Sequence, residues 1–334
     1  MRTIISKHLF AAVTLIGCVL LLCSWGVWGH EHINRAAIFA LPEEMGVFYY
    51  NHMDYLTEES VGPDQRKYTL NFKSENPRHF IDIEAFDKPV DSLPRYPKEA
   101  TAAYEENFLS KNGSLPWYIQ EVMVKLTKAF HDKRKSEILL LSADLGHYIG
   151  DAHMPLHTAL NHDGQLTNQV GIHALWESHL PELFGENYNL NTGKAQYLDD
   201  VSKETWRIIK SSHQLEDTLL AIDRNLTATF PADKKYRTDE SGKQIKNKFG
   251  QLIHSDEYCK QYHQALNGMV ENQMRGAIAA VANFWYTAWV NGGKPDLSTF
   301  DDPELTKQNH KFYQDDMKAW EKGKVTKLKI DAEF

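Results

Sequence analysis

Apolar residues recur along this chain every three to four positions, the period of an amphipathic helix, and few stretches alternate as strands do. The longest pattern runs over residues 257–290 and ends at the turn-forming sequence Asn291-Gly292-Gly293, which predicts a core helix. The pattern predicts helices over residues 30–41, 43–57, 115–131, 137–153, 173–183, 200–222 and 257–290. We therefore expect an all-α fold.

Two segments have the composition of connections between helices. Residues 87–97 contain three prolines, and residues 231–255 are polar and rich in lysine, with a short hairpin or loop insert expected around 233–255. Because there is no internal repeat and no clean boundary, residues 25–293 are expected to form a single large helical domain. Beyond this domain the chain becomes charged and loses apolar residues, so residues 294–334 are expected to be a charged C-terminal extension.

The first 24 residues have the pattern of a signal peptide. A short basic start is followed by an apolar run over residues 9–23 and a small residue, and the run is shorter than the roughly 20 residues that span a bilayer. We therefore expect export with cleavage before Trp25, and no transmembrane segment in the mature chain. A lipoprotein anchor at Cys23 is not expected, because Leu22 is not the small residue that such processing requires.

The cysteine count and the net charge indicate whether disulfides and a basic surface are to be expected. Cys18 and Cys23 lie in the expected signal peptide, so Cys259 is left alone in the mature chain and no internal disulfide is expected. The formal net charge of −8 predicts no basic surface over the whole molecule. A short single strand needs only a local cationic site and stacking, so this charge does not exclude nucleic acid. No stable protein partner is implied.

Histidines and carboxylates are spaced in pairs along two predicted helices. His147 and Asp151 are four residues apart and share a helix face, and His157 follows just beyond the helix end. One such pair is more often an ordinary ion pair on a helix surface. A second pair, His173 and Glu177, repeats the spacing, and imidazoles with carboxylates are ligands that suit zinc. Two pairs together favour a metal site.

Trp25 and His30 offer a further pair of ligands next to the expected cleavage point. If cleavage exposes Trp25, its free amine and carbonyl could chelate a metal together with His30. The alternatives are a buried N-terminal aromatic residue and a histidine that caps the start of a helix.

From Trp25 to about Glu177 the sequence resembles the superfamily that holds the single-strand-specific zinc nucleases (the S-one/P-one nuclease family) and bacterial zinc-dependent phospholipase C. The resemblance implies the all-α fold of these enzymes and three Zn²⁺ ions, and this sequence has a candidate residue for each zinc ligand of the family. The implied ligand sets are Asp64, His79, His147 and Asp151 for one ion; Trp25, His30 and a bridging Asp151 for a second; and His157, His173 and Glu177 for the third.

The resemblance also implies a phosphoester hydrolase. Two close zinc ions bridged by Asp151 would lower the pKa of a bound water for attack at phosphorus, and the third ion would hold the phosphate. Asp64 would act as a ligand or would steer the attacking oxygen. Lys67 would be a cation near the scissile phosphate, although the adjacent Arg66 is a rival and both could be a solvated basic pair.

Substrate choice depends on fewer residues. Phe80 and Asp82 resemble the nuclease segment in which the aromatic ring stacks on a base and the carboxylate binds its edge, but Phe80 could instead belong to the core. Glu177, the segment 33–36 and the lack of disulfides favour phospholipase C. We expect a single-strand nuclease with 3′-nucleotidase activity. The alternatives are a phospholipase C and, more remotely, an exported zinc-binding module without catalysis.

Overall fold

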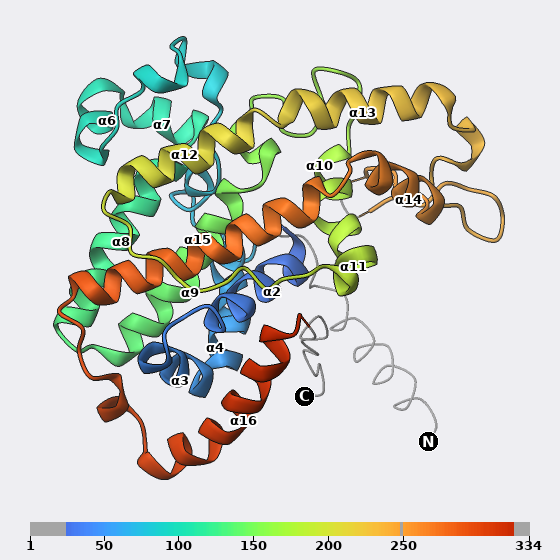
Figure 1. The fold of residues 1–334 in the computed structure, drawn as a ribbon. Helices are drawn as coiled ribbons and strands as arrows, with labels where there is room; N and C mark the ends of the chain where they lie inside the picture. The colour runs from blue at the N-terminus through green and yellow to red at the C-terminus, as the bar shows by residue number, and fades with distance from the viewer. Residues whose placement is uncertain (1–24, 248–249, 324–334) are drawn as a thin grey trace, which may run out of the picture.

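Helices make up most of the described chain, which comprises residues 25–247 and 250–323 of the computed structural model (Figure 1). Within these ranges extended pairing is limited to isolated bridges, so no sheet forms. The expected all-α fold is therefore confirmed. In chain order the α-helices are α2 (Gly26–Ile38), α3 (Glu43–Asn51), α4 (Met53–Glu58), α5 (Gly62–Tyr68), α6 (Pro97–Ala103), α7 (Glu106–Asn112), α8 (Leu115–His131), α9 (Lys135–Ala152), α10 (Ile172–Ala174), α11 (Leu180–Phe184), α12 (Val201–His213), α13 (Glu216–Thr229), α14 (Asp256–Ala265), α15 (Met269–Asn291) and α16 (Pro303–Glu321).

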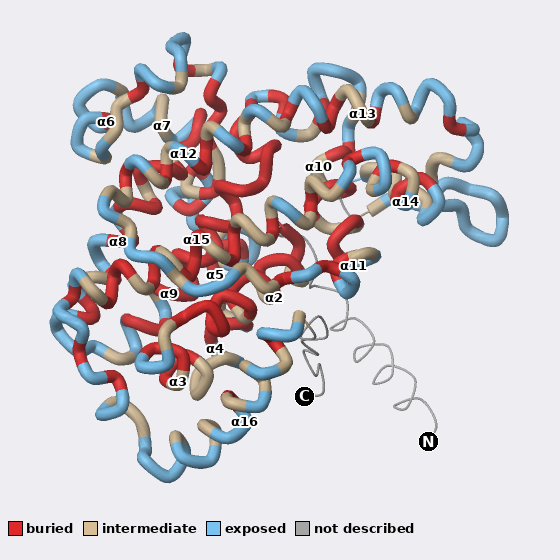
Figure 2. Tube along the Cα trace, in the orientation of Figure 1, coloured by how far each residue is buried: buried red, intermediate tan, exposed pale blue. Residues whose placement is uncertain are grey.

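Helix α9 lies at the centre of the molecule. It packs against α8, α15 and α2, and every residue from Ser142 to Ala152 is buried (Figure 2). The apolar side chains of Leu145 and Ile149 fill the space around it. Because α9 is covered on several sides, the polar side chains in its last turns lie in the interior and not at the surface.

Two glycines in α9 let α2 approach closely. A Cβ atom at Gly146 would lie 1.8 Å from Oδ1 of Asn34, and one at Gly150 would lie 3.1 Å from Nδ1 of His30. The Asn34 amide then donates hydrogen bonds to the carbonyl oxygens of Leu56 and Ala143, at 3.2 Å each. Small residues at this contact therefore place His30 directly beside the last turns of α9.

Three of the predicted helices are each two helices in the structure. The predicted helix over 257–290 breaks between α14 and α15, because Asn267 and Gly268 have φ angles of 49° and 81°, which no helix continues. The helix predicted over 200–222 turns at Gln214 and separates into α12 and α13, and the one over 43–57 breaks at His52, whose φ is −118°. Apolar periodicity continues across these turns, so it does not reveal them.

The other boundaries are closer to the prediction. Helix α8 has the predicted bounds, and α9 begins two residues earlier than expected. The helix predicted over 173–183 exists as α10, a π-helical turn η6 (Leu175–His179) and α11 in succession. A π-turn inserts one extra residue per turn and is frequent at functional sites.

The loop insert expected around 233–255 is present. It contains isolated antiparallel bridges, among them Tyr236 with His254 and Lys246 with Leu252, and projects beside α14 (Figure 1). Its described residues form isolated bridges and not the continuous strands of a β-hairpin.

Part of the expected C-terminal extension is packed and not merely solvated. Helix α16 lies against α3, with Tyr313 and Trp320 buried. The expected signal peptide, residues 1–24, and residues 324–334 lie outside the described residues. Among the helices that the structure describes, none is both long and apolar enough to cross a bilayer.

Candidate metal centre

The histidines and carboxylates predicted as ligands converge on one region around the end of α9. They come from segments far apart in sequence, including two 3₁₀ turns, η2 (Asn76–His79) and η5 (Pro155–Thr158). The contributing residues are His30 from α2, Asp64 from α5, His79 from η2, His147 and Asp151 from α9, His157 from η5, His173 from α10 and Glu177 from η6.

Asp151 is at the centre of this arrangement. Its Oδ1 lies 3.2 Å from Nδ1 of His157 and 3.6 Å from Nε2 of His30. Its Oδ2 lies 3.0 Å from Nδ1 of His79 and 3.2 Å from Nε2 of His147. Since the Asp151 side chain is fully buried and both oxygens face imidazoles, it is placed to join two groups of ligands.

The first of these groups contains Asp64, His79 and His147, all buried. Nδ1 of His79 lies 3.6 Å from Oδ1 of Asp64 and 3.0 Å from Nε2 of His147. The second contains His30, His147 and Asp151. In each group the candidate ligand atoms lie within 4.8 Å of one another, which is close enough for them to share one ion.

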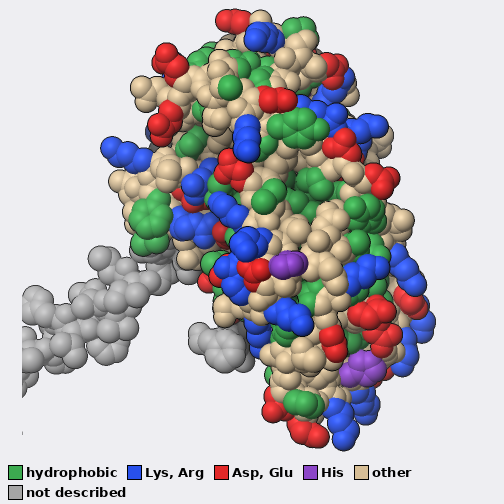
Figure 3. Space-filling view, turned by 90° about the vertical axis from the view of Figure 1, so that its left-hand side faces the viewer, with side chains coloured by type: hydrophobic (Ala, Val, Ile, Leu, Met, Phe, Trp, Pro, Cys, Tyr) green, Lys and Arg blue, Asp and Glu red, His purple; other side chains and the backbone are tan. Residues whose placement is uncertain are grey.

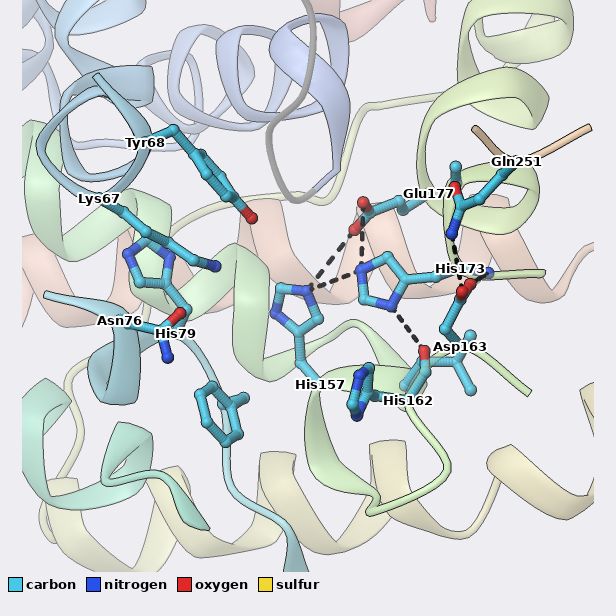
Figure 4. A pocket seen from close by; sticks show the side chains of 13 residues that line it. Lys67, Tyr68, Asn76, His79, His157, His162, Asp163, His173, Glu177 and Gln251 are labelled. Carbon is cyan, nitrogen blue, oxygen red and sulfur yellow. Dashed lines mark hydrogen bonds and ion pairs between the residues drawn. The ribbon is translucent and has the colours of Figure 1, made fainter. Parts of the chain in front are cut away.

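The third group, His157, His173 and Glu177, lies in the wall of a cavity (Figure 4). Nε2 of His157 is 3.2 Å from Nε2 of His173, and that same His173 nitrogen is 3.2 Å from Oε1 of Glu177. Oε2 of Glu177 lies 3.6 Å from Nε2 of His157. The side chain of His173 is the most exposed of the three, so this group is the one most open to a ligand from outside.

Trp25 is buried beside these groups. Its ring packs edge-on against Trp176 at 5.1 Å, and its Nε1 donates a hydrogen bond to the carbonyl oxygen of Gly150. Its backbone nitrogen donates to Oε2 of Glu177 at 2.9 Å. The structure therefore brings the Trp25 nitrogen to the third group, whereas the resemblance implies that it binds beside His30.

The hydrogen bonds of two imidazoles fix which nitrogen faces the cluster. Nδ1 of His147 lies 2.8 Å from the carbonyl oxygen of Ser60, and Nδ1 of His173 lies 2.7 Å from that of His162. A carbonyl only accepts, so Nδ1 carries the proton in both rings and a neutral ring turns the lone pair of Nε2 inward. This is the arrangement that holds metal-binding histidines in proteins.

The protonation preferences of the cluster indicate a demand for positive charge. Burial lowers the pKa of His147, but Asp151 and Asp64 outweigh it and raise that pKa to about 9. Burial also lowers the pKa of His173, but Glu177 outweighs this effect and raises that pKa to about 9. In contrast, burial together with His147 lowers the pKa of His30 well below its ordinary value. Among the described residues, neither ring nitrogen of His30 has a hydrogen-bond partner. The donor set therefore fits divalent cations held by imidazole and carboxylate.

A cavity of about 420 Å³ opens onto the third group. The Lys67 ammonium and the Tyr68 hydroxyl point into it from one side, opposite His173 and Glu177 (Figure 4). Burial lowers the pKa of Lys67, but neighbouring groups including Tyr68 and Asp64 outweigh it and raise that pKa, so Lys67 is a cation. The cavity thus has one wall with candidate metal ligands and an opposite wall with a cation.

Arg66, the rival of Lys67 in the sequence, has a different environment. Its guanidinium pairs with Asp144 at 2.8 Å and with Glu75 at 3.3 Å, and it does not line the cavity. It is held in an ion-pair network behind the cluster.

Phe80 and Asp82 differ in position, although the sequence places them together. Phe80 lines the cavity, whereas Asp82 does not and is buried. Oδ1 of Asp82 has no hydrogen-bond partner in the part of the chain that the structure describes. Burial, followed by Glu84, raises the pKa of this carboxyl to about 7. The structure therefore brings the aromatic ring to the cavity and leaves the carboxylate behind the wall.

Several lining residues are not among the sequence-based candidates: Tyr68, Asn76, Leu156, His162, Asp163, Ala174 and Gln251. His162 and Asp163 belong to the polar segment between the two predicted ligand helices, so their place at the cavity could be inferred from chain connectivity. Gln251 comes from the loop insert and donates to Oδ2 of Asp163 at 2.8 Å. No periodic or spacing signal in the sequence indicates that this insert folds over the site.

An all-helical fold with clustered histidines and carboxylates around a cavity defines a metal-binding helical protein with the plan of a phosphoester hydrolase. The chain matches the S1/P1 Nuclease family over residues 25–284, and it belongs to that family. These are metal-dependent enzymes of the nuclease type, so the chain is a phosphodiesterase by family and nucleic acid is the substrate class that the family implies. No curated protein matches the chain significantly.

Proposed function

We propose that the protein is a zinc-dependent phosphodiesterase that cleaves single-stranded nucleic acid and also acts as a 3′-nucleotidase. The observation that carries the proposal is the cavity on which the cluster opens, because its wall combines His157, His173 and Glu177 with the cation of Lys67 and the ring of Phe80. Metal ligands and a cation suit a phosphate, and an aromatic ring suits the attached base. The family match supports the same class of reaction.

Three Zn²⁺ ions would be held by this donor set. We assign Asp64, His79, His147 and Asp151 to one ion, and His157, His173 and Glu177 to another. The family resemblance assigns Trp25, His30 and Asp151 to the remaining ion, which requires the Trp25 nitrogen to exchange its contact with Glu177 for one beside His30. The ions, when bound, supply a Lewis acid that lowers the pKa of water and neutralises charge on the phosphate.

The residues of the chain have separate tasks in this proposal. Lys67 binds a non-bridging phosphate oxygen and stabilises charge that develops on it. Asp64 accepts a proton or orients the attacking oxygen, for which its fully buried carboxylate is suited. Phe80 offers a face for stacking. Only the family resemblance assigns Asp82 to the edge of the base, since this carboxylate does not line the cavity.

A second candidate, a phospholipase C acting on phospholipid head groups, is favoured by one observation. Tyr68, Leu70 and Phe72 are all exposed on the segment that forms one wall of the cavity, and Leu166 and Val170 are exposed on the segment that carries His162 and Asp163. Apolar side chains near a site mouth suit a lipid surface. The face in Figure 3 supports neither substrate, because basic and acidic side chains are mixed on it.

We also propose that the mature protein begins at Trp25, after removal of residues 1–24 during export. Burial of Trp25 and the contact of its backbone nitrogen with Glu177 support this proposal, because a new amino terminus at Trp25 would lie inside the metal cluster.

The test is to measure zinc per chain in the mature protein and then to incubate it with single-stranded DNA, single-stranded RNA, a 3′-nucleotide and phosphatidylcholine vesicles. Cleavage of the single strands and release of phosphate from the 3′-nucleotide are expected, with double-stranded DNA as the slower control. Cleavage of phosphatidylcholine alone would establish the second candidate. A zinc-loaded protein that cleaves no phosphoester would be the non-catalytic binding module, and the proposal would be wrong.

A further inference from the structure

A fourth group of potential metal ligands lies outside the cluster described above. It consists of Glu84 from the 3₁₀ turn η3 (Ile83–Phe86), His213 at the end of α12 and Glu216 at the start of α13. One ligand atom from each residue lies within 4.8 Å of the others, and none of the three belongs to the groups around Asp151.

Glu216 is the least expected member of this group. The residue is buried, and within the described chain its carboxylate has neither a hydrogen bond nor an ion pair. Burial raises its pKa to about 7, and the two charges that add to this effect, Glu84 and Asp217, are both negative. A carboxylate that is partly removed from water and faces other negative charges is destabilised unless a cation neutralises it.

The ring nitrogens of His213 also lack hydrogen-bond partners among the described residues. Its Nδ1 is buried and has no hydrogen-bond partner within residues 25–247 and 250–323. Its Nε2 is 3.8 Å from Oε1 of Glu84, which is beyond hydrogen-bonding distance. Glu84 uses its other oxygen, Oε2, to accept a hydrogen bond from the Leu160 amide at 2.9 Å. Each of the three residues therefore keeps at least one ligand atom available toward the others.

We propose that Glu84, His213 and Glu216 bind a divalent transition metal ion such as Zn²⁺. One imidazole and two carboxylates form a borderline donor set that suits this ion, and the imidazole disfavours Mg²⁺ and Ca²⁺. Glu84 and His213 are partly exposed, so the ion would keep water at its open positions and exchange more readily than ions in the buried cluster.

The position of the group indicates what the ion would do. It would connect η3 to the corner between α12 and α13, and through Glu84 to Leu160, which precedes the cavity residues His162 and Asp163. The ion would therefore stabilise the segments on which one wall of the cavity rests. This proposal does not depend on the reaction assigned to the cavity.

The test measures zinc per chain of the folded holoprotein across a series of buffered free-zinc concentrations. The wild type is expected to bind one zinc more at saturation than His213→Gln or Glu216→Gln, and this zinc is expected to be the first lost as free zinc falls. His310→Gln is the matched control, because His310 pairs with Glu43 at 3.0 Å at the surface and belongs to no group of three candidate ligands among the described residues. It is expected to bind as much zinc as the wild type.

A thermal measurement separates metal binding from folding. At low free zinc Glu216→Gln is expected to be at least as stable as the wild type, because the amide removes a negative charge that lies near Glu84 and Asp217. At high free zinc the melting temperature of the wild type is expected to rise further than that of the variant. Equal zinc content in wild type and both variants, or an equal rise in melting temperature, would overturn the proposal.

Discussion

Asp151 is the residue on which most of the candidate site depends, because four imidazoles face its two oxygens. Burial alone raises its pKa, but His147 and His157 outweigh burial and hold that pKa well below its usual range. The carboxylate is therefore ionised and shared, whereas Glu177 faces only His157 and His173 among the imidazoles. Substitutions at the two positions should differ accordingly.

Asp151→Asn is expected to lose more zinc and activity than Glu177→Asp. The amide removes the charge that two ions would share, whereas Asp at position 177 keeps a carboxylate for one ion. We expect kcat/KM to fall by at least about 1,000-fold for Asp151→Asn and by about 10-fold for Glu177→Asp. These changes correspond to losses of about 4 and about 1.4 kcal/mol of transition-state stabilisation. Zinc content and initial rates measure the difference, and mild effects of equal size would contradict the bridging role.

Lys67→Gln is expected to lower kcat/KM on single-stranded DNA by about 30-fold, because a charged hydrogen bond to phosphate contributes roughly 2 kcal/mol. Zinc content should not change, since an ammonium is no ligand. Lys73→Gln is the control, because Lys73 is an exposed lysine that does not line the cavity. If both variants keep the wild-type rate, Lys67 has no role in binding the phosphate.

At the scale of elements, the close contact of α2 with α9 positions His30. The Asn34 amide joins the carbonyl oxygens of two other helices, and Gly146 leaves the space for its Oδ1. At Gly146 the contact has no room for a Cβ atom, so it is sensitive to one added methyl group.

Gly146→Ala is expected to lower the free energy of unfolding by about 2 kcal/mol, because a Cβ 1.8 Å from Asn34 forces α2 outward. Alanine also favours the helix by about 1 kcal/mol, so the steric cost must exceed this gain. Gly276→Ala is the control: its Cβ would lie 3.1 Å from the His153 ring, and the helical gain should offset most of that strain. Urea unfolding measures the free energy of unfolding of both variants. Similar values would show that α2 and α9 can move apart at little cost.

The start of α2 permits a test of the proposed N-terminus. A mature protein with one alanine added before Trp25 is expected to lose one zinc and most of its activity, because an amide nitrogen lacks the lone pair of a free amine. The ring contacts of Trp25 with Trp176 and Gly150 should persist, so folding is not expected to fail. Full activity and full zinc content in the extended protein would exclude Trp25 as a ligand.

At the scale of the whole molecule, stability should depend on pH through histidines buried as neutral rings. His254 lies between Tyr236 and Tyr258, and burial, followed by Lys235 and His179, lowers its pKa to about 3. The unfolded chain has the ordinary value of about 6.5 and binds the proton more readily. The stabilisation is therefore complete above pH 6.5 and is lost as the pH falls toward 3.

Between pH 7 and pH 5 this one group is expected to reduce the free energy of unfolding by about 2 kcal/mol. His254→Phe keeps the aromatic stacking and removes the titration, so its loss over the same pH interval should be smaller by that amount. Denaturant unfolding at the two pH values gives the comparison. An identical pH dependence in the variant would place the His254 pKa near that of the unfolded chain.

Much of this protein follows from local sequence patterns. Apolar periodicity predicts the helical class and the bounds of α8 and α9, and spacing identifies the pairs His147 with Asp151 and His173 with Glu177 as candidate ligands. Helix geometry alone places the members of each pair on one face. The resemblance to a known family, and not periodicity, adds Asp64 and His79 to these candidates.

The breaks within three predicted helices and the distances between ligand groups were decided by tertiary structure. A turn at Asn267 and Gly268 preserves the apolar pattern on both sides, so periodicity continues across it. Contacts between segments distant in the chain decide which side chains line the cavity. They bring Gln251 to the cavity beside Asp163, and they leave Asp82 and Arg66 outside its lining. Sequence spacing determines which side chains share one helix face, whereas packing decides which faces meet.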